Sequence, residues 1–511
     1  SVVLLCSGFA LYSFFRLSAA EGQKDFNLYE LVPSTTSAVF VTDDVLEFVA
    51  EVDELTCSKN QQYLYVSKLF SYLKQSLYAL SEDTPHGLSR QMNQMLISFH
   101  EPDNERNQVL YCRLGNGDKE LVNRFVRKYI SSLYPPKTFI YKGEEIIIYP
   151  MADGDFLACY LTSDFMALSF QKKLIENVID AYKSGKSLAD DSTFTGIRAP
   201  KKSAAAATIY TRMQGMMGWT EFDMKMKDDF IYFSGITHDA DTCFAFINQL
   251  RQQQSVKGFP GEVLPSTAFY FSRQGITDWV SLLSYGNAQG QSVPARTSEV
   301  QNRDKEFSRY LMENAGQDLV ACLFQREDTL QGAAAVLSLS VADVTEAERM
   351  LRALVNAASA DEGRRNPRIT FCYTVNKAYP IYRLPQTTLF EQLTSFAEPT
   401  LDVYAAFYGG RLLLAPDADA LAHYIRQLDK GEVLNGAMAY QTGMDHLSDS
   451  YHFMLMADFD HIFQQSENHV RFVPDFFLRN ADFFRHFTLF VQFACADGVV
   501  YPNIVLKYKS E

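Results

Sequence analysis

The stretch that decides the fold runs from Asp155 to Phe194 and reads DFLACYLTSDFMALSFQKKLIENVIDAYKSGKSLADDSTF. Two short apolar runs flank a polar turn, and an amphipathic segment follows in which Ile175, Val178 and Ile179 recur at helical spacing. The pattern predicts a strand, a turn, a second strand, a helix and a small loop after the helix.

A second copy of this pattern runs from Asp402 to Leu434 and reads DVYAAFYGGRLLLAPDADALAHYIRQLDKGEVL. Its apolar helical positions, the glycine after the helix and the next leucine all lie 246 residues after those of the first copy. Gly409-Gly410 falls between its two strands and predicts a hairpin turn. The acidic pair Asp190-Asp191 has no counterpart, so the copies share a packing pattern and not a chemistry.

Other blocks recur in the same order. Val32–Thr35 (VPST) returns as Leu264–Thr267 (LPST) at a shift of 232 residues, each time before a predicted strand and helix. Predicted hairpins, each followed by a helix and further strands, come next in both halves. We therefore expect an α+β protein with two tandem homologous domains at residues 31–248 and 263–508, joined by a linker at residues 249–262. Each domain is expected to be largely antiparallel sheet with helices packed on one face.

Composition narrows the class of protein. A chain of 511 residues is too long for one compact core. Its 47 basic and 61 acidic residues give a net charge of −14, which argues against a nucleic-acid partner because phosphate contacts need clustered Lys and Arg. The eight cysteines are scattered without a CxxC pair, and most lie in apolar runs. We expect them to be buried as small apolar side chains.

The N-terminal segment is apolar and carries no charge before Arg16. One interpretation is a signal peptide cleaved after Ser18-Ala19-Ala20, and the other is a retained signal anchor. We expect a transmembrane anchor at residues 1–20 and a polar linker at residues 21–30. The bulk of the chain would then lie in the periplasm, held by a single span in the inner membrane.

The loop Ser187-Leu188-Ala189-Asp190-Asp191-Ser192-Thr193-Phe194 resembles one found in a bacterial family of exported, membrane-anchored proteins classed as a domain of unknown function. The apolar N-terminus and the Pro-Ser start of the domain are also similar to that family. The resemblance spans residues 26–508. In the second half the loop reads Glu432-Val433-Leu434-Asn435-Gly436 and departs from the motif. The resemblance implies an envelope location and no catalytic residue.

Several groups of polar residues invite a chemical interpretation. The densest group is acidic and histidine-rich: Asp445, His446, His452, Asp458, Asp460, His461 and His469. Its spacing matches no metal motif such as HExxH, and Asp458 is placed to cap a helix. Asp190 and Asp191 likewise predict helix capping. The Ser71-Tyr72-Leu73-Lys74 segment matches SxxK without the accompanying SDN or KTG motifs. We therefore expect no catalytic residue, no metal site and no cofactor.

Two apolar segments are candidate protein interfaces. The segment from Phe472 to Phe487 holds six phenylalanines within sixteen residues, and a methionine-rich segment precedes Trp219. Aromatic and methionine side chains are enriched at protein interfaces. The candidate interface residues are Met213, Met216, Met217, Trp219, Phe472, Phe476, Phe477, Phe483 and Phe484.

The expected function is that of a non-enzymatic, membrane-anchored scaffold, adaptor or chaperone-like subunit of a bacterial envelope complex, with other envelope proteins as partners. Two alternatives stay open. One is a hydrolase-like envelope enzyme with a site between the halves that uses His452, Asp458 and His461. The other is a receptor that holds a lipid or a glycan in a groove.

Overall fold

The computed structural model describes most of the chain after residue 25. The described ranges are 26–60, 93–101, 104, 106–115, 118–126, 134–151, 154–198, 205–212, 218–237, 245–280, 282–283, 297–326, 332–361, 369–375, 377–394, 400–464, 473 and 475–509. The expected anchor at residues 1–20 and the SxxK segment lie outside these ranges. Among the described residues, no helix combines the length and the apolar character that a membrane crossing requires.

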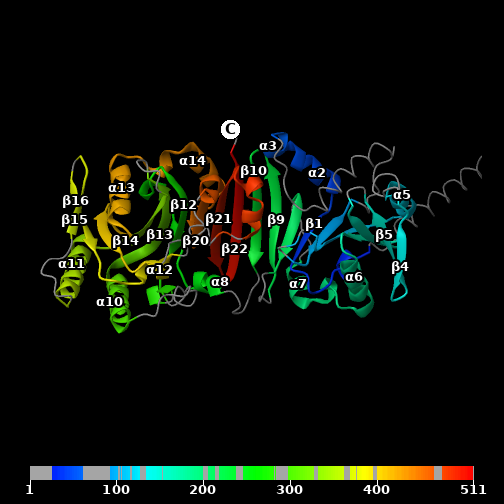
Figure 1. Cartoon of the computed structure of the whole chain (residues 1–511), viewed down its shortest axis with the longest axis horizontal. Helices are drawn as coiled ribbons and strands as arrows, with labels where there is room; N and C mark the ends of the chain where they lie inside the picture. Colours follow the sequence, from blue (N-terminus) through cyan, green and yellow to red (C-terminus); the bar gives the residue numbers. More distant parts are fainter. Residues whose placement is uncertain are drawn as a thin grey trace, which may run out of the picture. The chain divides into compact units, whose positions relative to one another are not determined.

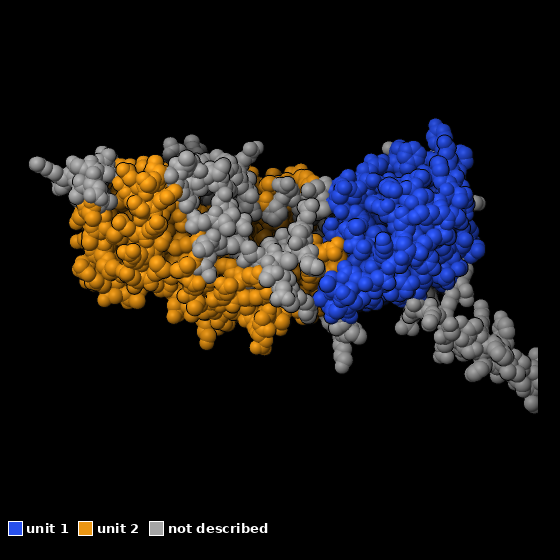
Figure 2. Space-filling model, turned by 90° about the horizontal axis from the view of Figure 1, so that it is seen from below, with its two compact units in different colours: residues 1–50, 65–211 blue, residues 51–64, 212–511 orange. Residues whose placement is uncertain are grey.

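The chain divides into two compact units (Figure 2). One comprises residues 1–50 and 65–211, and the other comprises residues 51–64 and 212–511. The expected linker at residues 249–262 lies inside the second unit, where it forms part of a helix, a two-residue strand and a 3-10 turn. Contacts therefore divide the chain earlier than the repeated sequence pattern does.

The first unit contains one antiparallel sheet (Figure 1). Its strands are β1 (Ala38–Thr42), β2 (Met95–Phe99), β3 (Gln108–Arg113), β4 (Lys137–Tyr141), β5 (Glu144–Pro150), β6 (Phe156–Leu161), β7 (Phe165–Ser169) and β8 (Ala207–Thr211). Its helical segments are η1 (Leu28–Glu30), α5 (Asp118–Phe125), α6 (Lys172–Ser184), η3 (Leu188–Asp190) and α7 (Ser192–Ile197); α2 (Val45–Glu54) crosses the division between the units. Strand pairing gives the order β8-β1-β2-β3-β7-β6-β5-β4.

The second unit has a larger antiparallel sheet. Its strands are β9 (Thr220–Lys227), β10 (Phe230–Thr237), β12 (Ala268–Gly275), β13 (Ala315–Gln325), β14 (Ala333–Val341), β15 (Ile369–Tyr373), β16 (Ala378–Arg383), β17 (Tyr404–Tyr408), β18 (Arg411–Ala415), β20 (Phe453–Asp458), β21 (Phe487–Ala496) and β22 (Val499–Tyr508). Strand pairing gives the order β9-β10-β22-β21-β20-β12-β13-β14-β18-β17-β16-β15. A separate pair joins β11 (Val256–Lys257) to β19 (Ser450–Tyr451).

Helices connect these strands. The helical segments of the second unit are α3 (Thr56–Lys59), α8 (Ala245–Arg251), η4 (Pro260–Val263), α10 (Ser298–Asn314), α11 (Val344–Asp361), α12 (Leu389–Leu393), α13 (Ala418–Asp429), η5 (Leu434–Gly436), α14 (Met438–Met444), α15 (Phe459–Phe463), α16 (Asp475–Arg479) and α17 (Ala481–Phe484). The expected α+β class with a large antiparallel sheet is confirmed.

The strand order of the first unit recurs inside the second, as β20-β12-β13-β14-β18-β17-β16-β15. The correspondence holds at single residues. An isolated bridge joins Pro33 to Ser187, and another joins Pro265 to Val433. These positions differ by 232 and 246 residues, the two shifts read from the sequence. The loop after the helix thus packs on the start of the first strand in the same way in both halves.

The helix of the opening stretch forms where its pattern predicts. Ile175, Val178 and Ile179 of α6 are fully buried, whereas Tyr182, one turn further along, is largely exposed. Gly185 follows α6 with a φ of +63°, a backbone conformation that side chains disfavour, and so ends the helix. Gly431 follows α13 with a φ of +76°.

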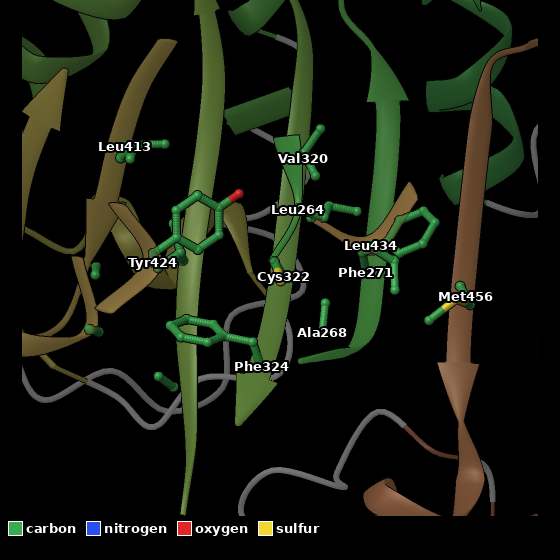
Figure 3. Close-up of a cluster of buried hydrophobic side chains, with 14 of the residues drawn as sticks. Leu264, Ala268, Phe271, Val320, Cys322, Phe324, Leu413, Tyr424, Leu434 and Met456 are labelled. Atoms are coloured by element: carbon green, nitrogen blue, oxygen red, sulfur yellow. The ribbon is translucent and has the colours of Figure 1, made fainter. Parts of the chain in front are cut away.

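The core of the second unit lies between its sheet and α13 (Figure 3). Strands β12, β13 and β18 contribute Phe271, Cys322 and Leu413, and the ring of Tyr424 from α13 meets that of Phe324 edge to face at 5.6 Å. Burial of such side chains is the main favourable contribution to folding.

Helices also lie against the opposite face of this sheet. Ile381 of β16 belongs to the core under α13. Its neighbour Tyr382 points the other way, because side chains alternate along a strand, and its hydroxyl donates to Glu348 of α11 at 2.6 Å. The expectation of helices on one face is therefore wrong for this sheet. Segment 298–306, expected to be a loop, is also helical as the first half of α10.

Candidate functional site

Two chemically suggestive pairs serve as helix caps. Asp191 accepts hydrogen bonds from the backbone N–H groups of Thr193 and Phe194 at 2.9 and 3.2 Å, at the start of α7. Asp190 completes a capping box with Ser187. Hydrogen bonds from Ser187 hold the pKa of Asp190 below its usual range. The capping prediction for both carboxylates is confirmed.

Asp458 and His461 do meet in the structure. Nδ1 of His461 lies 3.4 Å from Oδ2 of Asp458, and Nζ of Lys509 lies 2.6 Å from Oδ1. Asp458 also accepts from the backbone N–H of Asp460 at 3.0 Å, so it caps α15 as the sequence predicts. Burial opposes ionisation of Asp458, but His461 and Lys509 hold its pKa below the usual range. The carboxylate raises the pKa of His461.

The other histidines of that group do not join this pair. His452 precedes β20 and Asp458 ends it, so they are separated by roughly 20 Å of extended chain. Nδ1 of His452 accepts from the backbone N–H of Cys495 at 3.1 Å. His446 packs edge to face against Phe230 at 4.3 Å. Within the described ranges, no three His, Cys, Asp or Glu side chains converge as metal ligands would.

The most buried charges of the second unit form a cluster that sequence reasoning missed. Nε of Arg273 donates to Oδ2 of Asp318 at 3.0 Å, and Nη1 of Arg411 lies 3.3 Å from Oδ1. Burial opposes ionisation of Asp318, but the two guanidinium groups hold its pKa below the usual range. Arg273 also donates to the carbonyl of Gly258 at 2.8 Å. The cluster thus holds the chain around Gly258 onto the sheet, and only the strand order could have shown it.

The described cysteines are free thiols, and most of them are buried: Cys57, Cys112, Cys159, Cys322 and Cys372. Burial raises the pKa of Cys112 and of Cys159 to about 12. A thiol with such a pKa supplies almost no thiolate near neutral pH and is a poor nucleophile. The expectation of buried, unreactive cysteines is confirmed for these residues.

The residues expected at an interface divide into three groups. Trp219 and Phe484 are buried. Phe477 and Phe483 are half-buried, and their rings lie 4.8 and 5.0 Å from that of Phe484. The remaining positions lie outside the described residues or have side chains outside them: Met213, Met216, Met217, Phe472 and Phe476.

Exposed apolar side chains gather elsewhere, on the last strand of each sheet. Among the described residues, β4 pairs with β5 and β15 pairs with β16, and neither has a second partner strand. Most of the large apolar side chains that are more than half exposed lie on or beside these two strands: Tyr134, Ile140, Phe371, Tyr373 and Val375. We call the β4–β5 and β15–β16 pairs the outer hairpins.

No protein-family model, curated protein or solved structure matches this chain. The functional argument therefore rests on the chain's own geometry. The outer hairpins combine two features of a protein-binding surface, unpaired backbone hydrogen-bonding groups along one edge and exposed aromatic and branched side chains beside them.

Proposed function

We propose that this chain is a non-enzymatic, membrane-anchored scaffold or adaptor subunit of a bacterial envelope complex, with the outer hairpins as its contact surfaces. The observation that carries the proposal is the position of Ile140 and Phe371. They occupy equivalent places on β4 and β15, and their side chains are 72% and 52% exposed. Burying such side chains against a partner removes about 25 cal/mol per Å² of apolar surface from water.

The internal use of the polar clusters supports the same proposal. Asp191 and Asp458 cap helices, and Arg273 holds a backbone segment in place. The proposed arrangement has two further parts, an origin of the halves by duplication and an anchor at residues 1–20 in the inner membrane with the rest of the chain in the periplasm. Equal strand order in both halves supports the first part, and the apolar sequence before Arg16 supports the second.

The test is recovery of partners from solubilised bacterial membranes after mild cross-linking of the full-length chain. We expect a stoichiometric envelope protein with the unmodified chain and a clear loss of it with Ile140→Lys. Met438→Lys is the matched control, because Met438 is 80% exposed but lies away from the outer hairpins. Recovery of no other protein by the unmodified chain, or equal loss with both variants, would contradict the proposal.

A further inference from the structure

The free edge of β15 presents backbone hydrogen-bonding groups in a defined register. The N–H of Thr374 donates to the carbonyl of Lys377 at 2.9 Å and closes the β15–β16 hairpin. Because bonding alternates along an antiparallel pair, Thr370 and Cys372 also bond toward β16. The N–H and carbonyl groups of Phe371 and Tyr373 therefore point outward, away from β16.

The side chains of these two residues are exposed as well. Phe371 and Tyr373 are 52% and 69% exposed, and their ring centres lie 6.3 Å apart on the same face of the strand. Cys372 between them is fully buried under α13. Phe371 and Tyr373 thus offer both backbone groups and aromatic side chains to an incoming strand.

The sequence along this edge is self-complementary. Residues 369–375 read ITFCYTV, a near-palindrome centred on Cys372. We propose that a second copy of this chain adds its own β15 here, antiparallel, with the two-fold axis at Cys372. Phe371 then faces Tyr373 of the partner subunit and Thr370 faces Thr374 of the partner subunit. Aromatic pairs and threonine pairs both favour such a ladder, and no charge lies within it.

The equivalent edge of the first unit is blocked in ways that β15 is not. Lys137 begins β4, Lys142 follows it, and Pro136 precedes it. Nζ of Lys172 from α6 lies 5.1 Å from the ring centre of Phe139. Lysine and proline are the residues by which natural edge strands avoid pairing with other chains. One outer edge is thus protected, and the other is apolar and open.

The chain already joins equivalent strands in this manner. The hairpins β9–β10 and β21–β22 turn at Asp228 and Asp497, both with a φ of +51°, so their strands correspond at a shift of 269 residues. β10 and β22 pair antiparallel, and Ser234 faces its own counterpart, Asn503. Pairing of two β15 strands would repeat this two-fold geometry between subunits.

The test is the mass of the purified full-length chain in a mild detergent, by native mass spectrometry and sedimentation equilibrium. The inference rests on the proposed function only in treating the outer hairpins as contact surfaces. We expect a dimer of 58.0 kDa subunits. Phe371→Lys with Tyr373→Lys sets like charges opposite each other and should weaken the dimer at least about tenfold.

Charge reversal tests the register. Phe371→Lys with Tyr373→Glu places lysine opposite glutamate in both symmetric pairs, and should restore the dimer. Ile140→Lys on β4 should leave it intact. A monomeric unmodified chain, or equal behaviour of the two double variants, would overturn the inference. Unchanged tryptophan emission excludes misfolding as the cause of dissociation. Because no other protein is present, the dimer can fail while partner recovery succeeds, and the reverse.

Discussion

Asp318 gives the most demanding test of the energetics of the second unit. Asp318→Asn keeps the shape of the side chain and removes its charge. The guanidinium groups of Arg273 and Arg411, which lie 3.0 and 3.3 Å from its two oxygens, then stay close together without a counter-charge. Breaking a buried pair from one side costs about 3–5 kcal/mol. We expect about 3 kcal/mol, because the two arginine side chains keep 15% and 13% of their exposure.

The first unit supplies the matched comparison. In its register Val41, Gln94 and Phe165 occupy the positions of Arg273, Asp318 and Arg411. The same fold is therefore built there without the ions. Replacing a buried ionic cluster with apolar residues is often neutral or stabilising. Arg273→Val, Asp318→Gln and Arg411→Phe combined should cost less than about 1.5 kcal/mol, well below the cost of Asp318→Asn alone.

The assay is urea unfolding followed by tryptophan emission. The chain has two tryptophans, Trp219 and Trp279, and both lie in the second unit, so emission reports the unfolding of that unit. The midpoint should fall clearly for Asp318→Asn and only slightly for the triple variant, with equal slopes. A triple variant as unstable as Asp318→Asn would refute the reasoning, because the correspondence of the two registers or the cost of the stranded charges would then be wrong.

Three further predictions concern single side chains. Burial lowers the pKa of His100, whose Nε2 lies 2.9 Å from the Ser98 hydroxyl, to about 4, so the unfolded chain takes up a proton near pH 6.5 and the folded chain only near pH 4. Stability of the first unit should fall by up to about 3 kcal/mol as pH drops through that window. His100→Gln should remove this dependence in urea titrations followed by circular dichroism; an unchanged pH profile would contradict the assignment. Gly235→Val should cost about 2 kcal/mol in the tryptophan-emission midpoint, because a Cβ there would lie 2.8 Å from the ring of Pro502; an unchanged midpoint would count against this packing. Asp304→Ala should cost about 3 kcal/mol and speed amide exchange in α12, since the carboxylate accepts three hydrogen bonds from the two threonines before that helix; unchanged exchange would argue against that role.

Local features of this protein could be read from the sequence. The buried face of α6, its end at Gly185 and the cap at Asp191 follow from spacing and residue type within a few positions. The recurrence of LPST and of the glycine after the second helix predicted the correspondence of the halves. Each of these rests on interactions between residues close together in the chain, which leave a pattern in a single sequence.

Sequence patterns failed where the outcome depends on which strands become neighbours. Periodicity predicted neither the helices on both faces of the sheet nor the burial of Trp219. It placed the division between domains at residues 249–262. The contacts place it after residue 211, because β10 pairs with β22.

The opening stretch, from Asp155 to Phe194, shows the division most clearly. By itself it determined two strands, a helix and a capped turn. Only the tertiary structure decided that the strands beyond it end in β4, an edge guarded by lysines, and that the second copy ends in β15, an open one. An edge is defined by the absence of a neighbouring strand, and the pairing of strands far apart in the chain is set by the packing of whole sheets and not by any local run of residues.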